Sequence, residues 1–325
     1  MPHRKATTKA LLITLLAAAL FPTLPAHATE TTTTKAATAA PEEHKVETAE
    51  GITLRVRTMG EGDPVVLLSG GPGFAGEQMW PIATYVAKTN TAIVPDQRGT
   101  GQSKLDPFDP AAFSIDTMVQ DLEALRIHLG HDAWTLVGHS WGSILSMAYA
   151  AQHPDHVTSL VLVSPAGIES SFWSTYQTNL AARITPEMQA EMAQVQPTEQ
   201  TLEAFAEMSR AYNKIMAPAM VENESAIDAL RAEMSEDNMN PMVGLAMQQS
   251  LMSYDLRPDL TDFNKPTLVI QGDADPIGRE TADRITETIA SAKLETIENC
   301  GHWPFLETPK ALESAITAFL AKPQN

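Results

Sequence analysis

Ser140 lies in a sequence pattern that can make a nucleophile. Gly138–Gly142 reads GHSWG and fits G-x-S-x-G, with an apolar run, Trp134–Val137, before it and a good helix former, Ile144–Ala151, after it. A strand, a sharp turn and a helix in this order hold a serine hydroxyl above the edge of a sheet. The flanking glycines fit because a Cβ would crowd the strand and the helix that meet there. The pattern predicts Ser140 as the nucleophile of an acyl transfer, although the motif alone also occurs in plain glycine-rich turns.

A serine nucleophile needs a base within hydrogen-bond reach, and His302 is the histidine that the chain order favours. It lies in the loop Asn299–Pro304, after the last predicted strand. His139 is adjacent to Ser140 in the chain and cannot fold back onto it. The other histidines belong to the N-terminal segment or to helix ends, where imidazoles interact with the last carbonyls: His3, His27, His44, His128, His131, His153 and His156.

The base must be oriented by an acid, and a turn after the predicted strand Pro266–Gly272 offers two candidates. Enzymes with this type of serine turn run in the order Ser, Asp or Glu, His, so the acid should lie between Ser140 and His302. Asp275 fits the expected spacing from the strand better. Asp273 remains the other candidate, although a turn aspartate at that position more often bonds its own backbone.

The negative oxygen of a tetrahedral intermediate needs preorganised N–H donors. One donor is expected to be the amide of Trp141, directly after the nucleophile. The other is expected from the turn Ser69–Gly73, where glycines let the backbone approach a substrate, and Gly71 is the residue we select. An ordinary Gly/Pro turn is the alternative, but a place after the third strand favours an oxyanion hole.

The elements around these residues alternate between strands and helices, which predicts the α/β class: a mostly parallel sheet with helices on both faces. Residues 44–166 and 256–325 are expected to form this core. Residues 167–255 interrupt the alternation with helical patterns and hold 10 of the 15 methionines. We expect them to form a helical cap over the edge of the sheet where the strands end.

Four motifs together resemble the proline iminopeptidase family of α/β-hydrolases: Gly70–Gly73, Asp96–Ser103, Gly138–Ser143 and Gly301–Pro304. The likeness covers residues 45–165 and 265–320. It implies a serine exopeptidase that removes an N-terminal residue, often proline, with glutamates of the cap holding the free amine of the substrate.

The chain departs from that family pattern in three places. Ser69 stands where the family usually has histidine, and His139 stands where it often has a second glycine. The cap has no tryptophan after Trp173, so the substrate segment of proline iminopeptidases has no counterpart. The resemblance therefore assigns no cap glutamate.

The first 28 residues have the three parts of a secretory signal. Arg4, Lys5 and Lys9 form a basic region, residues 10–21 are apolar, and Ala26–Ala28 (AHA) fits a cleavage site. Residues 29–43 are rich in Thr and Ala and are expected to form a flexible leader. Cleavage after Ala28 predicts a secreted or periplasmic protein that is not membrane-bound in its mature form.

The net charge of the chain narrows the choice of binding partners. The full chain has a net charge of −18, and the chain after residue 28 keeps 19 basic and 40 acidic residues, a net charge of −21. This charge argues against nucleic acid or an anionic membrane as a partner.

The single cysteine, Cys300, excludes an internal disulfide. The sequence has no H-E-x-x-H, paired-cysteine or P-loop motif, so no cofactor or metal is expected.

These observations predict an exported serine hydrolase that works through an acyl-enzyme on a small molecule or a short peptide. An aminopeptidase that releases N-terminal residues is the leading reading. A carboxylesterase or lactonase acting on small apolar acyl compounds is the alternative. A binding module on a hydrolase scaffold is a remote one, since a binder has no need of a triad with two oxyanion segments.

Overall fold

The computed structural model describes residues 40–322. The predicted signal, residues 1–28, and most of the predicted leader lie outside these residues. The first strand, β1 (Glu42–Glu47), includes the last two residues of the predicted leader, Glu42 and Glu43. Its pairing with β2 (Thr53–Met59) explains the difference, because Glu42 and Glu43 lie opposite Thr58 and Arg57 in an antiparallel ladder. No helix among the described residues is long and apolar enough to cross a membrane.

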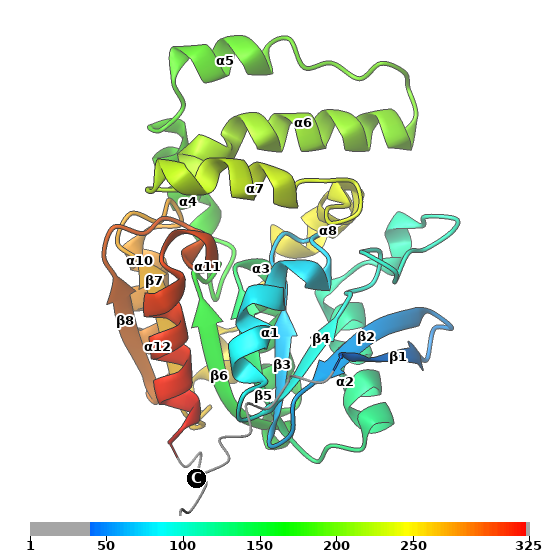
Figure 1. The fold of residues 1–325 in the computed structure, drawn as a ribbon, viewed down its shortest axis with the longest axis vertical. Coiled ribbons are helices and arrows are strands. Elements are labelled where there is room, and N and C mark those ends of the chain that lie inside the picture. Colours follow the sequence, from blue (N-terminus) through cyan, green and yellow to red (C-terminus); the bar gives the residue numbers. More distant parts are fainter. Residues whose placement is uncertain (1–39, 323–325) are drawn as a thin grey trace, which may run out of the picture. The chain divides into compact units, whose positions relative to one another are not determined.

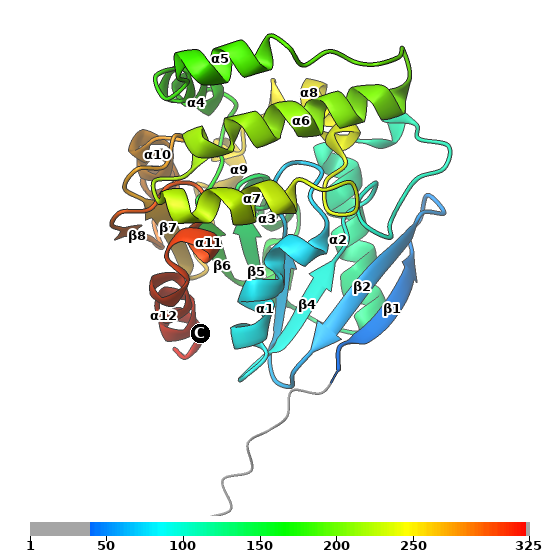
Figure 2. The same cartoon turned by 45° about the horizontal axis from the view of Figure 1, so that its top comes forward.

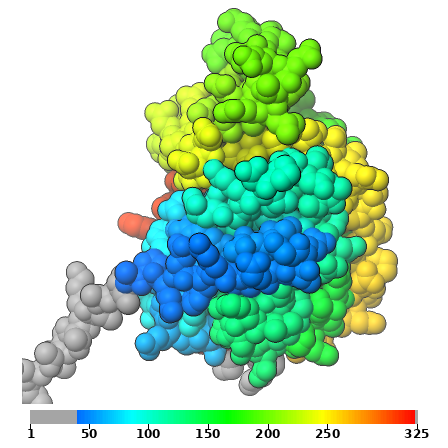
Figure 3. Space-filling view, turned by 90° about the vertical axis from the view of Figure 1, so that its right-hand side faces the viewer, coloured from blue at the N-terminus to red at the C-terminus, as the bar shows by residue number. Residues whose placement is uncertain are grey.

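Eight strands form one sheet in the order β1-β2-β4-β3-β5-β6-β7-β8. The pairs β1–β2 and β2–β4 are antiparallel, and every other neighbouring pair is parallel, which confirms the predicted α/β class. The remaining strands are β3 (Pro64–Leu68), β4 (Thr91–Pro95), β5 (Trp134–His139), β6 (Val157–Val163), β7 (Thr267–Gly272) and β8 (Ala292–Ile297). In the view of Figure 3, β1 and β2 form the blue band at the open edge of the sheet.

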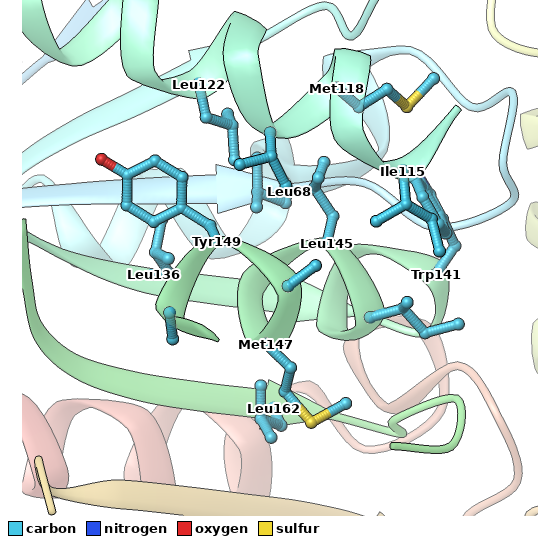
Figure 4. Close-up of a cluster of buried hydrophobic side chains, with 14 of the residues drawn as sticks. Leu68, Ile115, Met118, Leu122, Leu136, Trp141, Leu145, Met147, Tyr149 and Leu162 are labelled. Carbon is cyan, nitrogen blue, oxygen red and sulfur yellow. The ribbon is translucent and has the colours of Figure 1, made fainter. Parts of the chain in front are cut away.

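Helices cover both faces of the sheet because its strands are apolar on both faces. One face packs against α2 (Ile115–Leu129), α3 (Trp141–Gln152) and α10 (Arg279–Thr288), and the other against α1 (Trp80–Val86) and α12 (Pro309–Leu320). The strand period of two divides the side chains: Val66 and Leu68 belong to the first core, and Val65 and Leu67 to the second. Figure 4 shows Leu68, Leu136 and Leu162 of the strands beside side chains of α2 and α3.

The cap consists of five helices that enter after β6 and return before β7 (Figures 1 and 2). They are α4 (Phe172–Ala181), α5 (Pro186–Met192), α6 (Leu202–Met220), α7 (Ile227–Glu233) and α8 (Pro241–Leu251). Thr185, Thr201 and Asn240 cap the first turns of α5, α6 and α8 with their side chains, which satisfies free N–H groups. Short helices α9 (Arg257–Leu260) and α11 (Pro304–Glu307) belong to the core.

The two ends of the cap meet where it joins the sheet. Glu169 and Asp255 form an antiparallel bridge. The N–H of Ser170 donates to the Tyr254 carbonyl at 3.0 Å, and the N–H of Leu256 donates to the Ile168 carbonyl at 3.0 Å. The chain therefore leaves and re-enters the core at one point.

Candidate active site

Ser140 lies at the end of β5, in the sharp turn that the sequence predicts. Its backbone has φ 52° and ψ −115°, a conformation that L-residues rarely adopt and that turns the chain directly into α3. The Ser140 N–H donates to the Val163 carbonyl of β6 at 3.0 Å, which holds the turn against the sheet. A Cβ at Gly138 would lie 2.2 Å from the Gly142 carbonyl oxygen, so the glycines are required by close packing.

His302 and Asp275 form a buried pair beside this turn. The Nδ1 atom of His302 lies 3.0 Å from each carboxylate oxygen of Asp275. Since a carboxylate can only accept, Nδ1 carries the proton and Nε2 is left as the basic nitrogen. Burial acts to raise the pKa of Asp275, but the His302 charge and hydrogen bonds outweigh it and hold that pKa below its usual value.

Asp273 has a different partner. Its Oδ1 accepts from the N–H of Cys300 at 3.1 Å, so it holds the start of the loop that carries His302. The Cys300 thiol is buried, and burial raises its pKa to about 12, which keeps it protonated and poorly nucleophilic. Of the two candidate acids, the structure therefore brings Asp275 together with His302.

The two predicted oxyanion segments lie at the same cavity as Ser140, because Gly71 and Trp141 both line it. The Gly70 N–H donates to Gln78 Oε1 at 2.6 Å, so this neighbouring donor is already occupied. Gln97 joins the two segments: its Nε2 donates to the Ser69 carbonyl at 2.9 Å, and its Oε1 accepts from Trp141 Nε1 at 2.8 Å. Sequence reasoning missed Gln97, although its place in the Asp96–Ser103 motif could have drawn attention to it.

His139 is a second residue whose role the sequence did not reveal. Its ring is 1% exposed and its Nε2 lies 2.9 Å from the His302 carbonyl oxygen, so Nε2 carries the proton and donates. The ring centroids of His139 and His302 are 5.0 Å apart. Burial, with a further contribution from the His302 charge, lowers the pKa of His139 to about 3. A neutral His139 therefore supports the loop of His302 through this hydrogen bond.

A cavity of about 690 Å³ lies between the core and the cap and opens onto Ser140 and His302. Among the described residues that line it, none is Asp, Glu, Lys or Arg. The lining is rich in methionines and aromatic rings, which suit varied apolar ligands. They are Met216, Met220, Met234, Met239, Met252, Phe74, Trp141, Phe172, Trp173, Tyr176, Tyr212 and Trp303. Within residues 40–322 we find no group of three or more His, Cys, Asp or Glu side chains that could hold a metal ion.

Comparison with known proteins agrees with this fold. The chain matches the family model for the alpha/beta hydrolase fold over residues 63–309. It is 26% identical to a proline iminopeptidase of Heyndrickxia coagulans, covering 80% of this chain and 91% of that protein. A proline iminopeptidase of Clostridium botulinum is 28% identical over 81% and 91% of the two chains. A human monoacylglycerol lipase is also 28% identical, over 77% of this chain and 74% of the lipase.

Solved structures of two kinds share the fold. A thermophilic esterase from Thermogutta terrifontis superposes with a TM-score of 0.68 at 24% identity, covering 87% of this chain and all of the esterase. A proline iminopeptidase from Mycobacterium smegmatis superposes with a TM-score of 0.66 at 19% identity, over 86% and 97% of the chains. Fold, serine turn and sequence matches lead to one conclusion: this chain belongs to the alpha/beta-hydrolase fold family, as a serine hydrolase.

Proposed function

We propose that the protein hydrolyses neutral carboxylic esters with an apolar acyl group, through an acyl-enzyme on Ser140. The observation that carries this proposal is the lining of the cavity, which has no Asp, Glu, Lys or Arg side chain among the described residues. A charged substrate group would lose its hydration there without gaining an ionic partner, and such transfers are costly. Transfer of an apolar acyl chain from water into such a cavity is favourable, because it removes apolar surface from water.

In the acylation step, the Ser140 hydroxyl oxygen attacks the ester carbonyl carbon. Its proton passes to Nε2 of His302, and the Asp275 carboxylate stabilises the imidazolium through the two 3.0 Å contacts at Nδ1. The N–H groups of Gly71 and Trp141 bind the negative oxygen of the tetrahedral intermediate. The intermediate collapses, the bond to the alkoxy oxygen breaks, and His302 returns its proton to the leaving alcohol.

Deacylation repeats these steps with water as the nucleophile. His302 takes a proton from the water as it attacks the acyl carbon, and the same N–H groups bind the oxygen again. The bond to Ser140 breaks, and the serine oxygen recovers the proton from His302. The products are a carboxylic acid and an alcohol, and both halves of the cycle use one base.

An aminopeptidase is the second candidate, because proline iminopeptidases match most of this chain at 26–28% identity. That activity needs a carboxylate for the free amine of the substrate. The half-buried Glu233 is next to the cavity-lining Met234, and burial raises the pKa of its carboxyl, with Glu77 adding to the effect. Glu233 itself does not line the cavity, and no other carboxylate does among the described residues, which favours the ester reading.

A substrate panel separates the two candidates. We expect purified protein to turn over nitrophenyl esters of four- to eight-carbon acids, and to cleave proline and alanine arylamides far more slowly. N-acetylation of the arylamides should change kcat/KM little, because the cavity holds no partner for the amine. The opposite pattern, arylamide cleavage that acetylation lowers by 100-fold or more, would establish an amine site and the aminopeptidase reading. Ser140→Ala provides the blank for both arms.

We also propose that the protein is exported and loses residues 1–28. The basic, apolar and Ala26–Ala28 parts of the predicted signal support this proposal. These residues lie outside those that the structure describes.

A further inference from the structure

The carboxylate of Glu307, at the end of α11, accepts four main-chain hydrogen bonds. Its Oε2 accepts from Glu222 at 2.7 Å, Asn223 at 3.1 Å and Gly301 at 3.0 Å. Its Oε1 accepts from Trp303 at 3.0 Å. The residue is buried, and hydrogen bonds from N–H groups to an ionised, buried oxygen are among the strong ones in proteins.

The four donors come from two segments that are far apart in the sequence. Gly301 and Trp303 stand on either side of His302, whereas Glu222 and Asn223 belong to the cap, just after α6 ends at Met220. One carboxylate therefore joins the loop of the proposed base to the segment that follows the longest helix of the cap.

Two further contacts tighten the same junction. The N–H of His302 itself donates to the Met220 carbonyl at 2.9 Å. A Cβ at Gly301 would lie 2.7 Å from the Met220 carbonyl oxygen and 2.8 Å from the Val221 Cα, so the two backbones are in direct contact. Met220 also lines the cavity, and its sulfur accepts from the Tyr176 hydroxyl at 3.4 Å.

We propose that Glu307 is a positioning residue that fixes the His302 backbone to the cap. The inference rests on the proposed function, in which His302 is the base. His302 can serve Ser140 only if its ring is held to within a fraction of an ångström, and its neighbours on both sides are held by Glu307. The cap thus contributes to alignment of the base as well as to the cavity that receives the acyl group.

Glu307→Gln is the direct test, because it keeps the size of the side chain and replaces one acceptor oxygen with an NH₂ group that faces N–H donors. We expect kcat for a nitrophenyl ester to fall about 10- to 100-fold, with KM within about threefold, since misplacement of a reacting group lowers rate more than binding. The rate of fluorophosphonate labelling at Ser140 should fall in parallel. The downfield proton NMR signal of the Nδ1–H between His302 and Asp275 should shift or broaden.

Glu298→Gln is the matched control, because Glu298 is an exposed acid in the segment that leads to His302. It should keep the wild-type kcat, labelling rate and NMR signal. If Glu307→Gln does not fold, Glu307→Asp takes its place: it keeps the charge but is one methylene too short to reach both segments, and the same losses are expected.

A folded Glu307 variant with wild-type kcat, labelling and NMR signal would overturn the inference. So would a loss confined to thermal stability. Failure of the proposed function has a different signature, because wild-type protein would then show no ester turnover, whether or not Ser140 is labelled.

Discussion

At the residue scale, the site depends on which of three buried groups carries a charge. Asp275 is ionised because His302 Nδ1 and the N–H of Ile277, at 2.9 Å, both donate to it. His139 remains neutral, since burial and the neighbouring His302 both oppose a second cation. Two imidazolium rings with centroids 5.0 Å apart would repel each other strongly in a buried site. His302, the proposed base, can thus gain and lose the proton of the reaction without competition from His139.

Asp275→Asn should lower kcat by orders of magnitude, a class of effect that reaches about 10⁴ in serine proteases. The amide can donate to Nδ1, which would place the imidazole proton on Nε2, where it blocks acceptance from Ser140. Steady-state kinetics on a nitrophenyl ester measures the loss. Asp273→Asn is the comparison and should cost far less, because Asp273 contacts Cys300 rather than His302. A larger effect at Asp273 would reassign the acid.

His139→Leu should lower kcat roughly 10- to 100-fold, because it removes the donor to the His302 carbonyl and leaves that loop less well fixed. His139→Gln should retain most of the activity, since its amide NH₂ can reach the position of Nε2 and donate in its place. Kinetics on both variants, with fluorophosphonate labelling as a measure of the acylation step, tests the pair. Equal activity of the Leu and Gln variants would remove His139 from the support of His302.

The low pKa of His139 also predicts the pH dependence of stability. In the unfolded chain the ring binds a proton below its ordinary value of 6.5, whereas in the folded protein it does so only near pH 3. The unfolded state therefore binds more protons between these values, and His139 lowers the free energy of unfolding as pH falls from 6.5 to 3. In urea unfolding at pH 7, 5 and 4, His139→Gln should lose less stability on acidification than the wild type. Parallel pH curves for the two proteins would contradict this.

At the element scale, the sequence predicts best what local patterns determine. The turn between β5 and α3 and the strand β7 were predictable because each is an apolar run with a sharp turn signal next to it. Gln97 and His139 were not, because their partners, Trp141 and the His302 carbonyl, lie 44 and 163 residues away in the chain. The residues that line the cavity could not be predicted from the sequence either. Their identity depends on which faces of α4, α6 and α8 turn toward Ser140, and tertiary packing decides that.

Gly142→Ala tests the element that presents Ser140. Its Cβ would lie 2.2 Å from the Leu68 carbonyl oxygen, a backbone atom that cannot move aside, so we expect a loss of about 3 kcal/mol or more in the free energy of unfolding. Gly130→Ala is the matched variant: Gly130 has φ +73° but nothing within 4 Å of its Cβ position, so only the left-handed conformation costs energy, about 1–2 kcal/mol. Urea unfolding should rank the two variants in this order, and the reverse order would refute the packing argument.

At the scale of the whole molecule, the proposed export implies that the mature protein lacks residues 1–28. Protein recovered from the periplasm or the medium should have the intact mass of a chain that starts at Thr29, because cleavage is expected after Ala28. Ala28→Arg should impair cleavage, since the site requires a small residue, and Thr31→Arg should not. Uncleaved wild-type protein confined to the cytosol would contradict the proposal.

The meeting of the two cap ends at Glu169 and Asp255 has an evolutionary consequence. A lineage can lengthen, shorten or exchange everything between these residues without moving a strand of the sheet, because the junction closes on itself. Selection for a new substrate can then change the cap while the segments of the proposed serine, acid and oxyanion hole stay the same. An incoming cap must also supply main-chain donors for Glu307, a carbonyl for the His302 amide, and a partner for the Gly73 carbonyl, which here accepts from the Asn240 N–H at 2.9 Å. We expect replacements that keep these contacts to give a working enzyme, whatever the rest of the cap resembles.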